Sequence, residues 1–132
     1  MPLRGRYLHT MIHVADLERS IDFYTRIMGM SVLRRGEMSA ERRRNAFVGY
    51  GAEDETAVLE LTAFHDRDHY NAGDAFGHFA LGFADVRLAC AAIAAAGGNV
   101  STQPYVIASG KTVAFVTDPD GYAIELVQPA PA

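Results

Sequence analysis

Residues 7–17 read Tyr7-Leu8-His9-Thr10-Met11-Ile12-His13-Val14-Ala15-Asp16-Leu17. A matching pattern returns at residues 76–86 as Phe76-Gly77-His78-Phe79-Ala80-Leu81-Gly82-Phe83-Ala84-Asp85-Val86. Each copy is an alternating run typical of a strand, and its histidine precedes by seven residues an Asp that is suited to open a helix. Each half also carries an Ala-Phe-Val strand, at 46–48 and 114–116, and closes on a strand containing Glu-Leu, at 57–62 and 122–127. Because so many features recur in the same order, we predict two tandem βαβββ modules.

These modules define an α+β fold in a single domain over residues 1–132, with sheets that curve around a shared site. The modules cover approximately 7–64 and 75–128, and the short polar segment 65–74 joins them. We expect Asp16 and Asp85 to cap the two helices, which end near Gly29 and at Gly97-Gly98. The sequence Asp-Pro-Asp-Gly at 118–121 predicts the turn of the last hairpin.

The composition is that of an ordinary soluble domain, with 49% apolar residues and a formal net charge of −4. A chain of this size buries roughly two thirds of its unfolded surface, so it needs no metal or disulfide to hold its core together. The mild acidity disfavours nucleic acid as a partner. No apolar run approaches the roughly 20 residues that span a bilayer, and we expect a cytoplasmic protein without a membrane partner. The single cysteine, Cys90, fits a reducing compartment and an inert buried thiol.

Four polar side chains stand out because each lies opposite the apolar face of its predicted strand. Side chains of a strand alternate between its two faces, so these four share the sheet face that points away from the helices. They are His9, Glu60, His78 and Glu125. Two imidazoles and two carboxylates suit a divalent ion such as nickel, zinc, cobalt, manganese or iron, and they leave two octahedral positions for water or for two oxygens of a substrate. The alternative is a set of hydrogen-bonded strand histidines and solvated glutamates, but the recurrence of the four as an ordered pair of pairs favours a metal site.

Other candidates are weaker. His65 and His69 have an i, i+4 spacing, but their segment lacks helical periodicity and is interpreted as a solvated linker. The run Arg42-Arg43-Arg44 either flanks an exposed loop or binds an acidic substrate. No nucleotide-binding motif is present.

With these motifs the chain resembles glyoxalase I, also called lactoylglutathione lyase, of the vicinal oxygen chelate superfamily, over roughly residues 7–128. The motifs that carry the resemblance are Leu8-His9-Thr10-Met11, Arg19-Ser20-Ile21-Asp22-Phe23-Tyr24, Phe47-Val48-Gly49-Tyr50-Gly51, Val58-Leu59-Glu60-Leu61-Thr62, Gly77-His78, Asp118-Pro119-Asp120-Gly121-Tyr122 and Ile124-Glu125-Leu126. The resemblance implies that His9, Glu60, His78 and Glu125 are the metal ligands. It also implies a homodimer whose sites lie between subunits, with His9 and Glu60 from one chain and His78 and Glu125 from the other. The short chain resembles the forms that favour nickel or cobalt over zinc.

The activity implied by this resemblance is the isomerisation of the hemithioacetal of methylglyoxal and glutathione to S-lactoylglutathione through a cis-enediolate. The metal stabilises developing oxyanion charge, and a carboxylate carries the proton between adjacent carbons. By resemblance Glu125 is the base, and Glu60 is its partner in the second proton transfer.

Two positions depart from the family pattern. The family usually has Arg four residues after the first His ligand and Asn four residues after the first Glu ligand, where this chain has His13 and Phe64. Both positions contact glutathione in the family, so another thiol stays an alternative co-substrate. Further alternatives are another isomerase, epimerase or lyase of the superfamily and a non-catalytic drug-binding protein. An extradiol dioxygenase is disfavoured, because that chemistry uses two His and one carboxylate.

Overall fold

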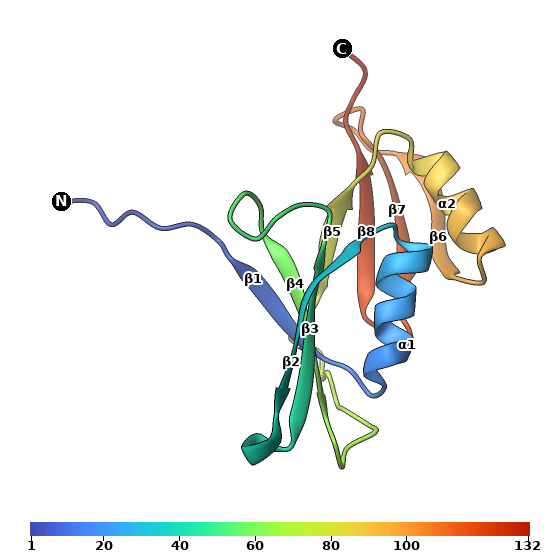
Figure 1. Ribbon diagram of the computed structural model, residues 1–132. Helices are drawn as coiled ribbons and strands as arrows, with labels where there is room; N and C mark the ends of the chain where they lie inside the picture. Colours follow the sequence, from blue (N-terminus) through green and yellow to red (C-terminus); the bar gives the residue numbers. More distant parts are fainter. The chain divides into compact units, whose positions relative to one another are not determined.

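The computed structural model describes all residues from Met1 to Ala132 and divides the chain into two compact units, Met1–Tyr70 and Asn71–Ala132 (Figure 1). The division falls inside the segment 65–74 that the sequence predicts as a linker. Each unit contains one four-stranded mixed sheet and one principal helix.

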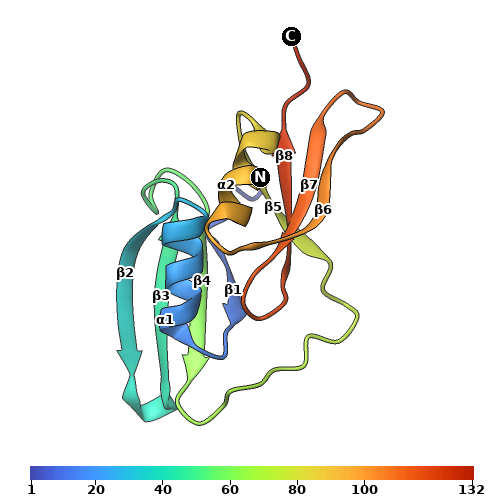
Figure 2. The ribbon, with the colours of Figure 1, turned by 90° about the vertical axis from the view of Figure 1, so that its right-hand side faces the viewer.

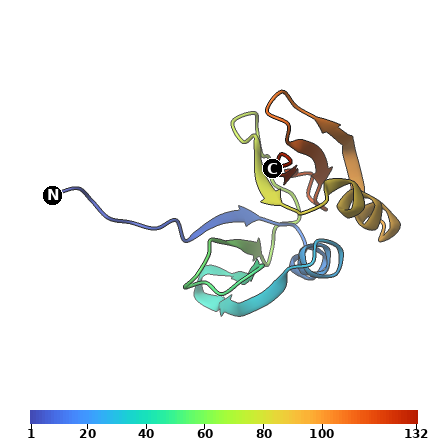
Figure 3. The ribbon, with the colours of Figure 1, turned by 90° about the horizontal axis from the view of Figure 1, so that it is seen from above.

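The first unit is built from β1 (His9–His13), β2 (Ser31–Met38), β3 (Arg43–Gly49) and β4 (Val58–Phe64). The strand order is β1-β4-β3-β2, with β1 parallel to β4 and the other neighbours antiparallel. Helix α1 (Leu17–Asp22) packs against β3 and β4 and lies across one face of the sheet (Figure 2). A 3-10 turn, η2 (Ser39–Glu41), links β2 to β3. Residues 1–8 precede β1 as an extended segment, seen from above in Figure 3.

The second unit repeats this plan. It contains β5 (His78–Gly82), α2 (Val86–Ala95), β6 (Asn99–Val106), β7 (Thr112–Thr117) and β8 (Ala123–Gln128). The strand order β5-β8-β7-β6 and the parallel pairing of β5 with β8 match the first unit. The predicted α+β fold of two βαβββ modules is therefore confirmed.

The predicted helix starts are also confirmed. The Asp16 side chain accepts a hydrogen bond of 3.1 Å from the backbone N–H of Arg19, and Asp85 accepts one of 2.9 Å from Leu88. These bonds satisfy N–H groups that have no partner inside the helix. Gly97 follows α2 with a φ of +93°, a conformation that glycine adopts without steric cost.

The turn of the last hairpin is organised by Asp118. The N–H of Gly121 donates to the Asp118 carbonyl at 3.0 Å, and the Asp118 carboxylate accepts from the N–H groups of Asp120 and Tyr122, both at 2.9 Å. The predicted turn at 118–121 thus fixes the register between β7 and β8.

The first helix differs from the prediction of one regular helix ending near Gly29. After α1 the backbone widens into a π-helical turn, η1 (Phe23–Ile27), in which the N–H of Met28 donates to the carbonyl of Phe23. The Thr25 hydroxyl also donates to the Ile21 carbonyl at 2.7 Å, a bond that competes with regular helical pairing. The widened turn accompanies the burial of two consecutive aromatic residues, Phe23 and Tyr24.

Each unit has its own core between the helix and the sheet. In the first unit, Leu17, Ile21 and Tyr24 of the helical segment are buried over the sheet, and in the second unit Val86, Cys90 and Ile93 of α2 are buried in the same way. Cys90 is a free cysteine with 4% of its surface exposed, and burial raises the pKa of its thiol. None of the helices has the length and apolar character required to cross a membrane.

Candidate metal centre

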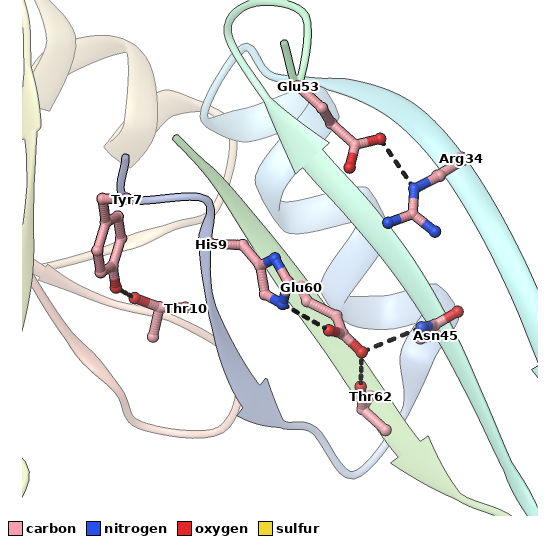
Figure 4. Close-up of polar contacts among 8 residues, drawn as sticks. All are labelled: Tyr7, His9, Thr10, Arg34, Asn45, Glu53, Glu60 and Thr62. Atoms are coloured by element: carbon pink, nitrogen blue, oxygen red, sulfur yellow. Dashed lines mark hydrogen bonds and ion pairs between the residues drawn. The ribbon is translucent and has the colours of Figure 1, made fainter. Parts of the chain in front are cut away.

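The parallel pairing of β1 with β4 brings His9 to Glu60. His9 lies opposite Val58 and Met11 lies opposite Glu60, so His9 and Glu60 are diagonal neighbours on one face of the sheet. The His9 Nε2 atom is 3.3 Å from the Glu60 Oε1 atom (Figure 4). The His9 side chain is 36% exposed and the Glu60 side chain 16%, so the pair is accessible from the open face of the sheet.

The second unit contains the equivalent pair. His78 lies opposite Ala123 and Ala80 opposite Glu125, which sets the same diagonal between β5 and β8. The His78 Nε2 atom is 3.5 Å from the Glu125 Oε1 atom. An aromatic ring stands edge-on to each imidazole: Phe47 at 5.2 Å from His9 and Phe115 at 5.3 Å from His78, between ring centroids.

These two pairs fit the donor requirements of a divalent metal. Imidazole nitrogen and carboxylate oxygen are common ligands of zinc, nickel and cobalt. Two donors bound to one ion at about 2.1 Å lie about 3 Å apart when their bonds are at right angles, close to the separations found here. Within either unit, no group of three or more His, Cys, Asp or Glu side chains suited to a metal is assembled. Each unit therefore contributes half of the predicted four-ligand set, and the assignment of all four as ligands stays a prediction.

The Glu60 carboxylate is also held from the side away from His9. Its Oε2 atom accepts a hydrogen bond of 3.0 Å from the Asn45 amide and one of 2.9 Å from the Thr62 hydroxyl (Figure 4). Asn45 and Thr62 face each other across β3 and β4, and both are buried. Strand alternation puts Thr62 on the face of Glu60, two residues along the same strand. From the sequence Asn45 was missed, because only the register between β3 and β4 reveals it.

At the other end of the same face, His13 and Phe64 come together. Their ring centroids are 5.3 Å apart, and the Tyr70 ring stacks on His13 at 5.2 Å. The guanidinium of Arg67 lies over the Tyr70 ring, 4.5 Å from its centroid. Burial lowers the pKa of His13 from its ordinary value of 6.5, and Arg67 and Arg43 lower it further. The sequence missed Arg67 and Tyr70, because the segment 65–74 has the composition of a solvated linker.

The other candidates form contacts of their own. His65 forms no helical clamp with His69, and its Nε2 atom contacts the Glu37 carboxylate at 2.8 Å. Arg42 and Arg43 form ion pairs with Asp66 and Glu41.

Comparison with known proteins identifies the family. Residues 6–126 match the model of the Glyoxalase/Bleomycin resistance protein/Dioxygenase superfamily, and the chain belongs to this superfamily. A protein of Vibrio parahaemolyticus named probable lactoylglutathione lyase is 51% identical over 125 residues, which cover 94% of this chain and 91% of that protein. This protein is a lyase, an enzyme of the glyoxalase I group, as the sequence predicts.

Solved structures agree with this assignment. Glyoxalase I from Zea mays is 39% identical, with a TM-score of 0.91 over 96% of this chain, although the chain spans only 46% of the length of the maize protein. The trypanothione-dependent glyoxalase I of Leishmania major is 42% identical, with a TM-score of 0.85 over 95% of this chain and 87% of that protein. The two-module fold of this chain is thus the fold of glyoxalase I.

Proposed function

We propose that this protein is a metal-dependent glyoxalase I that converts the hemithioacetal of methylglyoxal and a thiol into an S-lactoyl thioester. The observation that carries this proposal is the repeated His–Glu pair, with Nε2–Oε1 separations of 3.3 Å and 3.5 Å on the open faces of two equivalent sheets. Relatives named lactoylglutathione lyase support the same chemistry.

The reaction is an isomerisation and needs no oxidant or reductant. A proton leaves the carbon that bears sulfur and returns to the neighbouring carbonyl carbon, so the thiol-bearing carbon becomes a thioester and its neighbour an alcohol. A divalent ion bound by His9, Glu60, His78 and Glu125 would act as a Lewis acid toward the two adjacent oxygens of the substrate. Glu125 accepts the proton as general base, and Glu60 is the second carboxylate available for proton transfer.

The complete metal site requires one His9–Glu60 pair and one His78–Glu125 pair. We propose a homodimer in which His9 and Glu60 of one protomer join His78 and Glu125 of the partner subunit. The support for this arrangement is that each unit brings two of the four ligands together, His9 with Glu60 and His78 with Glu125. Nickel or cobalt is the proposed metal, with zinc as the alternative. The unpaired Cys90 supports a reducing, cytoplasmic setting.

The thiol is proposed to lie along the face of β1 and β4, from His9 toward His13. These residues are four apart on one strand, so the two positions are separated by about 13 Å. His13 and Phe64 then contact the distal part of the thiol. A mostly neutral imidazole is a weaker partner for a carboxylate than an arginine fork, and Phe64 donates no side-chain hydrogen bond. Glutathione is the first thiol to test, and a trypanothione-dependent relative gives the reason to test others.

The experiment is metal removal and replacement. The protein is stripped with a chelator and reloaded separately with nickel, cobalt or zinc, and thioester formation is followed from methylglyoxal with glutathione and with a panel of other thiols. We expect the stripped protein to be inactive and nickel or cobalt to restore turnover. Full activity of the stripped protein would contradict the metal-dependent mechanism. Tight metal binding without turnover with any thiol would instead indicate a different substrate.

A further inference from the structure

The two carboxylates of the predicted metal site are held differently, although the sheets that carry them are equivalent. Phe47 pairs with Glu60 in the first unit and Phe115 pairs with Glu125 in the second, which fixes the correspondence between the two sheets. In the first unit, Asn45 lies two residues before Phe47 and pairs with Thr62. In the second unit, Val113 lies two residues before Phe115 and pairs with Val127. The two donors that hold Glu60 are therefore replaced by two valines around Glu125.

This difference changes the freedom of each carboxylate. Glu60 Oε2 accepts hydrogen bonds from Asn45 and Thr62, so its carboxylate plane is fixed while Oε1 points to His9. The polar contact of the Glu125 side chain within its own unit is with His78, and neither Val113 nor Val127 has a side chain that can donate a hydrogen bond in place of Asn45 or Thr62. Glu125 can therefore turn away from His78 without breaking another polar contact.

The position of Asn45 depends on a glycine in the adjacent strand. Gly36 of β2 lies opposite Asn45, and a Cβ atom at Gly36 would come within 2.6 Å of the Asn45 Oδ1 atom. No real Cβ contact is so short, so only glycine at this position leaves the amide where it meets Glu60.

We propose that Asn45, with Thr62, is a positioning residue that keeps the Glu60 carboxylate in place as a fixed metal ligand, whereas Glu125 lacks such donors and keeps the freedom to turn. This inference rests on the proposed function. Residues that orient a metal ligand in this way change metal affinity or activity by about 10- to 100-fold when they are replaced.

The first test measures metal binding, independently of turnover. We expect Asn45→Leu and Thr62→Val to weaken nickel binding by about 10- to 100-fold in calorimetric titrations and to alter the visible absorption spectrum of the cobalt-loaded protein. Thr62→Ser keeps the hydroxyl and is expected to restore both properties. Gly36→Ala is expected to act in the same direction as Asn45→Leu, because it displaces the amide without removing it.

The matched control is Asn99→Leu, which removes an amide–hydroxyl hydrogen bond of 2.7 Å to Thr117 in the second unit and touches no glutamate. We expect its nickel affinity to equal that of the unaltered protein. Thermal unfolding of each metal-free variant shows whether that variant is folded. If Asn45→Leu does not fold, comparison of Thr62→Val with Thr62→Ser tests whether the hydrogen bond to Glu60 determines the nickel affinity.

The second test transfers a donor to the other carboxylate. Val127→Thr puts a hydroxyl beside Glu125 where Thr62 stands beside Glu60, and we expect kcat to fall while nickel affinity is kept. Unchanged kcat in Val127→Thr, or unchanged nickel affinity and cobalt spectrum in both Asn45→Leu and Thr62→Val, would overturn this inference and leave the proposed function standing. An unaltered protein that binds no divalent metal would overturn both.

Discussion

Replacing Glu125 with glutamine keeps the size of the side chain and removes its ability to accept a proton. We expect Glu125→Gln to fold normally and to lose turnover by about 10²- to 10⁴-fold, the usual contribution of a general base. Initial rates with saturating nickel measure this loss, and circular dichroism checks the fold.

Glu55→Gln is the matched control, because Glu55 is exposed and its side chain forms no ion pair. We expect this variant to retain full activity. Normal turnover in Glu125→Gln would show that another group accepts the proton.

The pKa of His13 offers a test of the contacts at the far end of β1. Burial lowers this pKa from 6.5, and the nearby charges of Arg67 and Arg43 lower it further, so the folded protein favours the neutral imidazole. Replacing Arg67 with alanine removes one positive charge and the group that lies over Tyr70. We therefore expect Arg67→Ala to raise the pKa of His13, measured by NMR titration of the imidazole.

The same shift has a consequence for stability. The pKa of His13 is lower in the folded protein than its ordinary value of 6.5. The free energy of unfolding is therefore at its full value, as far as His13 is concerned, above pH 6.5, and part of it is lost as the pH falls below that value. Arg67→Ala is expected to weaken this acid sensitivity. Arg26→Ala serves as the control, because Arg26 pairs with Asp22 on the first helical segment and does not affect His13. An identical His13 titration in Arg67→Ala would contradict the effect of the Arg67 charge on His13.

At the scale of the elements, the two N-caps make the helices a measurable part of the stability. We expect Asp16→Ala and Asp85→Ala each to lower the free energy of unfolding by about 1 kcal/mol, because each leaves a first-turn N–H without its acceptor. Urea titration followed by circular dichroism measures the change. Asp54→Ala, in an exposed loop, is expected to change the free energy by less than about 0.5 kcal/mol. Equal effects at all three positions would contradict the capping role.

The sequence allowed accurate prediction of elements whose signals are local. Alternation placed His9 and Glu60 on open strand faces, and an Asp followed by an apolar stripe marked the start of each helix. The π-helical turn at Phe23–Ile27 was missed, because it depends on which backbone carbonyl accepts the hydrogen bond from each backbone N–H of this segment. Asn45 was missed for a related reason: its relation to Glu60 is set by the pairing of strands that are distant along the chain.

For the whole molecule, the proposed homodimer predicts that two inactive variants complement each other. His9→Gln damages one half of every site and His78→Gln the other half, so each homodimer is expected to lose activity. In a mixed dimer both substitutions fall in one site, and the other site has all four original ligands. Unfolding and refolding an equal mixture is therefore expected to restore about a quarter of the unaltered activity, because half of the dimers are mixed and each of these has one intact site.

The controls for this experiment are the two variants refolded separately, and light scattering establishes the number of subunits. Recovery of activity in the mixture with none in the separate samples would support a site shared between subunits. No recovery, with mixed dimers verified by mass spectrometry of differently tagged chains, would show that each site takes its four ligands from one chain.

The buried thiol of the second unit has a chemical consequence for a protein that handles a reactive aldehyde. Methylglyoxal is an electrophile, and a cysteine attacks such compounds as the thiolate and not as the protonated thiol. Cys90 is 4% exposed, and burial raises its pKa, so little thiolate forms and little of it is reachable. The fold thereby protects the only cysteine of the chain from covalent damage by the compound that the enzyme is proposed to remove.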